Sequence, residues 1–292
     1  MKYYLMIGLT FASLNGWTQS SKKVPYDSTL SKSEIRIGLW YSSDYYFMGR
    51  NDSTPAPYLS PSITYSHKSG MFIRSNISIL TSKEQMRVDM FGLTGGYDYY
   101  GERLAWGISL SEYFFSESSY VVQAEMSTYI NSFVGYDFSA FTLFADASLG
   151  ISEGTDLFLG TEVSRIFYIL NNRLSIRPSL TLNAGTQKYY DQYYQYRSTE
   201  SGFGKGKDGK GKGNQSTTTN VYLTSAEKFQ MLDYEASLQL AYRLQKIRLF
   251  TIATWTFPVN PSTIVADNTT QEEILKNGFF WSAGVRLSLS GK

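Results

Sequence analysis

The residue types that carry most enzymatic chemistry are scarce in this chain. It contains one histidine, His67, and no cysteine, which excludes disulfides, thiolate chemistry and cysteine-ligated metal sites. A zinc site is not expected from so few ligands. Ser66 precedes His67, but adjacent residues of a strand point to opposite faces, so the two side chains do not converge as nucleophile and base. We expect a turn residue at His67, no enzyme activity and no cofactor.

Two carboxylates recur in similar surroundings, Asp98 in GGYDYYGERL and Asp137 in VGYDFSAFTL. Paired carboxylates suit acid–base chemistry, but each aspartate here precedes a tight turn and an apolar strand. This position favours a role in the turn. A hydrolase that uses Asp191, Asp208 and Asp267 in the long links stays open as the least supported alternative.

The most basic stretch is GFGKGKDGKGKGNQ, residues 202–215. It lacks the order of a phosphate-binding P-loop, and Gly/Lys-rich sequence of this kind is flexible and solvated. Its lysines form a basic patch that either contacts lipid phosphates or polysaccharide, or is a solvated loop tip: Lys205, Lys207, Lys210 and Lys212. The preceding tyrosines of KYYDQYYQY, residues 188–196, extend a strand into an aromatic girdle or form a stacking surface for sugars, and we favour the girdle.

The composition and the first residues indicate an exported protein. The 292 residues include 24 Tyr and 18 Phe, and the net charge of +2 gives no reason to expect a nucleic-acid partner. Lys2 followed by the apolar run 3–14 and by polar residues to Ser20 predicts a signal peptide over residues 1–20. We expect a periplasmic segment at 21–33 and one β domain over 34–292, whose longest loop is 190–228.

Alternation of apolar and polar residues predicts the elements that position every candidate site. About twelve strand-like segments follow residue 33, mostly longer than the five or six residues of soluble strands. They are 34–49, 57–67, 71–80, 85–100, 103–115, 125–138, 141–152, 156–170, 173–189, 229–244, 247–257 and 278–290. Short turns alternate with mostly longer links, which is typical of an outer-membrane barrel with turns in the periplasm and loops outside. An even strand number places both termini in the periplasm.

The two faces of the strands favour lipid on one side and a wet lumen on the other. In the segment 229–244, the apolar side runs from Leu232 through Tyr234 to Leu244, and the opposite side is polar. The polar faces carry charges of both signs, which suits a confined lumen where charges find partners. The lumen-facing candidates are Arg74, Asp89, Asp146, Glu162, Arg177, Glu235, Arg243 and Arg286. Pro61 and Pro178 interrupt strands, and we expect a β-bulge to accommodate each.

The C-terminal stretch SAGVRLSL, Ser282 to Leu289, resembles the insertion signal of bacterial outer-membrane β-barrels. Ser282, Gly284, Leu287 and Leu289 match its polar, glycine and alternating apolar positions, whereas the usual terminal aromatic residue is absent. The exported part as a whole resembles the tyrosine-rich barrels of Bacteroidota. This resemblance implies an all-β, closed antiparallel transmembrane barrel in contact with outer-membrane lipid and, through its last strand, with the barrel-insertion machinery.

Three functions stay open for such a barrel. The first is a narrow porin-like channel for small polar solutes, although Phe72, Phe144 and Phe280 project inward and long loops folded into the mouth would close it. The second is a non-conducting scaffold or binding protein, whose loops 190–228 and 258–277 present a surface to an envelope protein. The third is the hydrolase.

Overall fold

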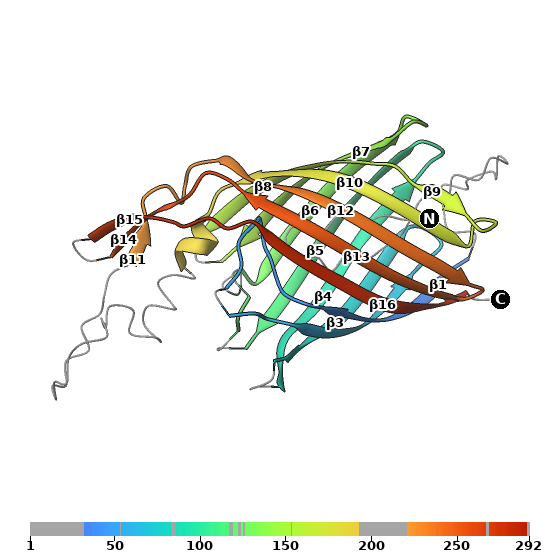
Figure 1. The fold of residues 1–292 in the computed structure, drawn as a ribbon. Helices are drawn as coiled ribbons and strands as arrows, with labels where there is room; N and C mark the ends of the chain where they lie inside the picture. The colour runs from blue at the N-terminus through green and yellow to red at the C-terminus, as the bar shows by residue number, and fades with distance from the viewer. Residues whose placement is uncertain are drawn as a thin grey trace.

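The computed structural model describes residues 32–52, 54–82, 86–116, 119–121, 124, 126–152, 154–192, 221–266 and 269–290. Within these ranges, twelve long antiparallel strands close into one barrel (Figure 1). They are β1 (Glu34–Ser42), β2 (Tyr58–Ser66), β3 (Met71–Thr81), β4 (Met86–Tyr100), β5 (Leu104–Phe115), β6 (Thr128–Asp137), β7 (Thr142–Ile151), β8 (Thr155–Ser164), β10 (Leu174–Gly185), β12 (Gln230–Leu244), β13 (Ile247–Pro258) and β16 (Gly278–Ser290). The predicted closed barrel and its strand number are confirmed.

Each long strand pairs with the next long strand along the chain, and one further pairing, between β1 and β16, closes the ring. β10 pairs with β12, from Leu174 opposite Tyr242 onward. β1 pairs with β16, from Glu34 opposite Ser290 to Ser42 opposite Ser282. The first and last strands therefore meet at a seam, and no long strand keeps a free edge, as a membrane interior requires.

The links at the two ends of the barrel differ in length (Figure 1). One end, which we call the turn end, carries short turns such as Gln245–Lys246, the start of β1 and the end of β16. Left-handed backbone at Ser139, Leu170, Asn171, Asn172, Gln245 and Gly70 permits these turns. The opposite end, the loop end, carries the links 43–57, 116–127, 186–229 and 259–277.

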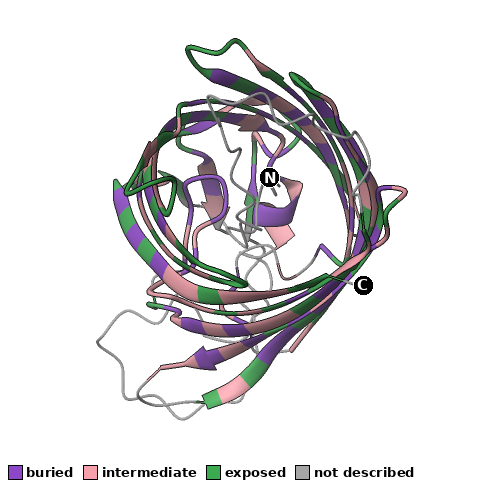
Figure 2. Cartoon of the chain, turned by 90° about the vertical axis from the view of Figure 1, so that its right-hand side faces the viewer, coloured by how far each residue is buried: buried purple, intermediate pink, exposed green. Residues whose placement is uncertain are grey.

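The barrel is apolar outside and polar inside, the reverse of a soluble domain. Ile63, Ile108 and Leu180 point outward and are 52%, 52% and 65% exposed. Seen from the turn end, buried and exposed residues alternate along the strands (Figure 2). Buried serines, threonines and charged residues line the interior, among them Thr94, Ser111 and Glu162. An apolar belt of this size around a polar interior is the arrangement of strands that cross a bilayer.

Both strand prolines are accommodated without the expected bulges. The β2–β3 ladder lapses between Leu59 opposite Ile79 and Ser62 opposite Asn76, and Pro61 lies in this lapse while it stays opposite Leu39 of β1. Beside Pro178, the neighbouring strand is interrupted between β8 and β9 (Phe167–Ile169), although the register continues across the gap.

Two β-bulges lie elsewhere, and one of them overturns a predicted orientation. The register shifts at Asp89 in β4 and at Leu232 in β12, each an extra residue without a partner in the ladder. A bulge changes which residues point inward. Leu232 and Asp233 are therefore both fully buried, although the alternation predicts Leu232 on the lipid side.

The links at the loop end contain structure that the alternation does not predict. β11 (Val221–Leu223), β14 (Thr263–Ala266) and β15 (Thr269–Glu272) form a small separate sheet beyond the barrel (Figure 1). Residues 188–192 are helical. The expected strand 34–49 is too long, because the chain leaves β1 at Ser42 and the rest of that segment folds into the mouth.

Candidate functional site: the barrel interior

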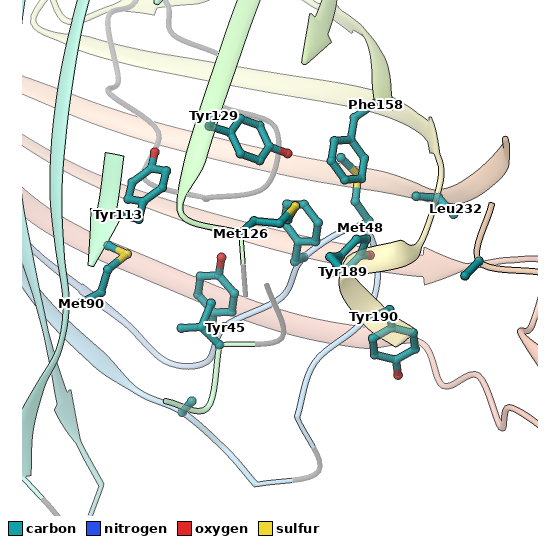
Figure 3. Packing of buried hydrophobic residues seen from close by; sticks show 14 of the residues in the cluster. Tyr45, Met48, Met90, Tyr113, Met126, Tyr129, Phe158, Tyr189, Tyr190 and Leu232 are labelled. Atoms are coloured by element: carbon teal, nitrogen blue, oxygen red, sulfur yellow. The ribbon is translucent and has the colours of Figure 1, made fainter. Parts of the chain in front are cut away.

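The interior has two parts, a charged polar wall and an apolar cluster in the loop-end mouth. The cluster, which we call the loop-end plug, joins residues of the links to inward-facing strand residues (Figure 3). Its buried members are Tyr45, Phe47, Met48, Ala56, Tyr58, Leu80, Met90, Tyr113, Val121, Met126, Tyr129, Phe158, Tyr189, Tyr190, Leu223, Ala226, Leu232 and Ile264.

Aromatic rings form the centre of the loop-end plug. The ring of Phe47, from the β1–β2 link, lies edge-on to Phe158 of β8 at 5.4 Å and to Tyr189 of the helical segment at 4.8 Å. Tyr129 of β6 stacks on Phe158 at 6.0 Å. Side chains from the wall, from a link and from the helical segment thus share one core, which fixes the links inside the mouth.

This packing overturns the preferred interpretation of the tyrosines near residue 190. Tyr189 and Tyr190 are 0% and 5% exposed and belong to the plug, so they do not form an outer girdle. The strand ends at Gly185, and the helical segment turns these two rings inward. The other tyrosines of that stretch, and the four loop lysines Lys205, Lys207, Lys210 and Lys212, lie outside the described residues.

Arg50 connects the plug to the loops above it. It is 3% exposed and forms an ion pair with Glu273, with 3.3 Å between Nε and Oε1. Its guanidinium also donates to the carbonyls of Met48 and Leu232 and lies 5.7 Å from the ring centre of Tyr190. A buried charge with this many partners is well compensated, so Arg50 holds together the β1–β2 link, β12 and the link before β16.

The β1–β2 link approaches the wall so closely that one position requires glycine. Gly49 has a φ of +78°, and a side-chain carbon there would lie 2.7 Å from the Cβ of Asp233. At the start of the link, Asp44 accepts hydrogen bonds from the backbone N–H groups of Tyr45 and Ala56. Burial raises the pKa of Asp44 above its ordinary value, against the opposing effect of these hydrogen bonds.

Asp156 of β8 holds the helical segment in place. Its carboxylate accepts hydrogen bonds from the hydroxyl of Thr186 at 2.6 Å and from the backbone N–H groups of Lys188 and Tyr189, both at 2.8 Å. The first N–H groups of a helix have no partner within it. A buried carboxylate on the barrel wall supplies that partner here, and its negative charge suits the N-terminal end of the helical dipole.

Below the plug, four carboxylates gather on one side of the lumen. Asp146 of β7 and Glu162 of β8 are nearly fully buried, and Glu235 and Asp233 follow on β12. Glu162 and Glu235 both lie opposite Thr181 of β10, and Asp233 lies opposite Asn183. Arg177 forms an ion pair with Glu162. We call these four carboxylates the acidic wall. They occupy two adjacent rows of directly opposite residues across β7, β8, β10 and β12.

The remaining predicted lumen residues have other neighbours. Asp89, fully buried at the β4 bulge, accepts hydrogen bonds from Tyr58, Ser116 and Ser119 and pairs with Arg87 at 2.9 Å. The Arg74 Nε donates to Thr64, and its guanidinium lies over the ring of Phe72. The prediction of inward-facing phenylalanines agrees with the burial of Phe72, Phe144 and Phe280 at 7%, 1% and 3%.

Arg243 and Arg286 do not lie opposite carboxylates. Arg248 of β13 stands between them, directly opposite Arg243 of β12 on one side and Arg286 of β16 on the other. We call these three residues the arginine row. It lies near the turn end, on the lumen side of its strands. Sequence reasoning missed Arg248, although the Gln245–Lys246 turn alone places it opposite Arg243.

The lone histidine has the role expected of a turn residue. Its Nδ1 lies 2.8 Å from the hydroxyl of Ser69, whereas Ser66 accepts a hydrogen bond from Arg36 across the lumen side. Asp137 accepts the backbone N–H of Ser139, a turn-forming interaction. No group of three or more potential metal ligands occurs in the part of the chain that the structure describes. In that same part, no helix is long and apolar enough to cross a membrane.

A closed ring of antiparallel strands with an apolar exterior and a charged interior defines a transmembrane β-barrel protein of the outer-membrane class. No family model and no curated protein matches the chain. Solved structures with a similar fold include the KdgM porin, at TM-score 0.47 and 8% identity over 87% of this chain and 99% of that one. The NanC porin gives 0.46 and 9% over 87% and 100%. LpxR from Salmonella typhimurium gives 0.42 and 9% over 86% and 99%.

Proposed function

We propose that the protein is a narrow, porin-like channel for small polar solutes, whose loop-end mouth is closed by the plug in this conformation. The observation that carries the proposal is the charged interior below the plug. A barrel that only anchored loops would have no need to keep Asp146, Glu162, Arg177 and Glu235 inside, because burying charges is costly. A hydrated pathway supplies the solvent that makes such a wall tolerable.

The proposed orientation places the turn end in the periplasm and the loop end outside the cell. It is supported by the contrast between the two-residue turn at Gln245–Lys246 and the long links 186–229 and 259–277. Both ends of the barrel chain, at Glu34 and Ser290, then face the periplasm. The plug closes the outer mouth, so solutes pass when the links move away from Phe158 and Tyr129.

The test is ion conductance in planar bilayers. We compare the wild type with a variant in which residues 45–56, which bring Phe47 and Arg50 into the mouth, are replaced by a short Gly/Ser linker. The wild type is expected to conduct rarely and the variant steadily, since removing the link removes the plug's centre. A matched control exchanges residues 68–69 of a turn-end loop for glycine and leaves the conductance at the wild-type level. Absence of current from the folded, plug-less barrel refutes the channel.

A second function is favoured by one specific observation, the completeness of the plug. Phe47, Phe158 and Tyr189 are almost entirely buried, as in the core of a rigid domain. A non-conducting protein that presents its loops to an envelope partner would keep such a core permanently. The β11–β14–β15 sheet, in which Tyr222 is 47% exposed, then supplies the surface together with Ile274, which follows β15 and is 83% exposed. This alternative predicts no current from either variant and loss of partner binding on deleting residues 221–223 with 263–272.

A further inference from the structure

Asp146 differs from the rest of the acidic wall in having no hydrogen-bond partner. Its side chain is buried at 6% exposure, and neither carboxylate oxygen accepts a hydrogen bond within the described residues. Glu162, by contrast, forms an ion pair with Arg177. Asp233 and Glu235 are hydrogen-bonded to each other. A buried carboxylate without compensation is costly, so Asp146 calls for a positively charged donor that its neighbours do not supply.

The inward-facing residues around Asp146 combine a second carboxylate with aromatic rings. Phe133 of β6 and Gly160 of β8 lie directly opposite Asp146, on either side of β7. Gly160 adds no side chain, and two residues further along β8 stands Glu162, a diagonal neighbour of Asp146. On β7 itself, Phe144 faces inward beside Asp146, and its ring centre lies 6.2 Å from that of Phe133. Asp146 is thus bordered by rings on one side and by a carboxylate on the other.

A second buried group without a partner belongs to the same region. Tyr129 of β6 is 5% exposed and is part of the loop-end plug (Figure 3). Its hydroxyl has no hydrogen-bond partner in the part of the chain that the structure describes, and it lies within electrostatic range of Asp146. A carboxylate only accepts hydrogen bonds, and a tyrosine hydroxyl accepts them as well as donating one. The group that both side chains lack is therefore a hydrogen-bond donor.

The surroundings of Asp146 select one class of cationic donor. A metal ion is not favoured, because no group of three or more potential metal ligands occurs among the described residues. A quaternary ammonium has no N–H to give to the two carboxylate oxygens. A primary ammonium has three N–H donors and one positive charge. Its charge is also attracted to aromatic faces, such as those of Phe133 and Phe144.

We propose that Asp146 binds the primary ammonium group of a small polar solute, with Glu162 and the hydroxyl of Tyr129 beside it. The proposal rests on the proposed channel in that it names the class of solute. The site lies below the plug, on the wall that a solute would pass. Binding is measured without any current, so the ammonium site and the channel can fail separately.

The experiment is a ligand-detected NMR titration of the full-length folded protein in a non-ionic detergent at constant ionic strength. The plug-less variant with the linker at residues 45–56 is titrated in parallel, because Asp146 is enclosed in the closed conformation. Ethanolamine is the primary ammonium probe. Choline has methyl groups in place of its N–H donors, and ethylene glycol is the neutral comparison. We expect ethanolamine to bind one or both proteins, and the two comparison compounds to bind about tenfold or more weakly.

Two substitutions separate a ligand site from a structural carboxylate. Asp146→Asn is expected to weaken ethanolamine binding about ten- to a hundredfold, the range of a lost charge-assisted pair. It is also expected to keep or raise the melting temperature, because it removes an uncompensated buried charge, whereas loss of a structural contact would lower it. The matched control is Asp98→Asn, which removes an equally buried carboxylate of β4, 4% exposed, and leaves the affinity unchanged.

The possible results are distinct. The proposal is overturned if ethanolamine binds neither protein, if Asp146→Asn binds as tightly as its parent, or if Asp98→Asn loses as much affinity. Choline binding as tight as that of ethanolamine overturns the assignment to a primary ammonium. Binding that depends on Asp146 but comes without conductance refutes the channel alone. Conductance without ethanolamine binding refutes the ammonium site alone.

Discussion

Replacing Asp156 by asparagine is expected to release the helical segment 188–192 and open the plug without unfolding the barrel. The carboxylate accepts three hydrogen bonds, from Thr186, Lys188 and Tyr189. An amide of the same shape keeps one acceptor oxygen, which at the position of Oδ1 still accepts from Thr186 and Lys188, but it turns an N–H₂ group toward the backbone N–H of Tyr189. The barrel strands on either side of Asp156 keep their ladders with β7 and β10.

The size of the effect follows from these three contacts. A buried donor left without a partner costs about 1–3 kcal/mol, and the charge at the start of a helix contributes about 0.3–1 kcal/mol. With the two bonds to Oδ1 retained and the bond from Tyr189 lost, the expected loss is about 1–4 kcal/mol for the closed arrangement. At about 1.4 kcal/mol per factor of ten, the ratio of open to closed plugs rises about tenfold to several hundredfold.

Two assays measure this change. Amide hydrogen exchange over residues 187–192 is expected to accelerate by that factor, because protection reports the opening equilibrium. The current per inserted molecule in planar bilayers is expected to rise as well. The matched control is Asp137→Asn, which weakens a contact to Ser139 in a turn at the opposite end. Equal exchange in Asp156→Asn and the wild type, or an equal gain in the control, would refute the reasoning.

Three further predictions concern a disulfide that would hold the helical segment, the ion pair of Arg177 with Glu162, and the lipid-facing side of the barrel. The chain has no cysteine, and a Cβ at Gly154 would lie 3.9 Å from that of Lys188, so the double variant Gly154→Cys with Lys188→Cys is expected to form a disulfide. Oxidation of this variant is expected to suppress the current, and dithiothreitol to restore it. A current that oxidation does not change would contradict a moving helical segment. Arg177→Gln is expected to lower thermal stability by about 3–5 kcal/mol, because it leaves Glu162 uncompensated, and adding Glu162→Gln recovers most of the loss in a detergent melt. Leu180→Arg, on the outer face, is expected to cost about 2–4 kcal/mol in lipid, whereas Leu180→Phe is neutral; equal stability of the two in liposome unfolding would place this face away from lipid.

Alternation in the sequence predicts the strands well because the two media on either side of a barrel wall impose it directly. The segment 247–257 matches β13 (Ile247–Pro258) almost residue for residue. The alternation fails at Leu232, where one unpaired residue reverses the inward and outward positions. Leu232 packs in the apolar plug. An apolar residue therefore suits this position whether it faces the plug or the lipid, and the residue type gives no sign of the bulge.

The plug could not be predicted from periodicity, because contacts between distant residues form it. Arg50 and Glu273 are 223 positions apart, and Asp156 fixes a segment about thirty residues further along the chain. The tyrosine-rich stretch near residue 190 suits an interface girdle and a buried core equally well by composition. The arginine row, by contrast, was available from sequence, since a two-residue turn fixes which residues face each other.

The pairing of β1 with β16 has a consequence for how the molecule is made and can be rearranged. The ring cannot close until the last segment of the polypeptide has been synthesised, so its formation depends on contacts of the longest possible sequence separation and is expected to be slow. Since Glu34 and Ser290 are direct neighbours, a short peptide can join them. A circular permutant with new termini at Gln245 and Lys246 would then keep every ladder. Its synthesis would start at β13 and end at β12, so the ring would close between these two strands.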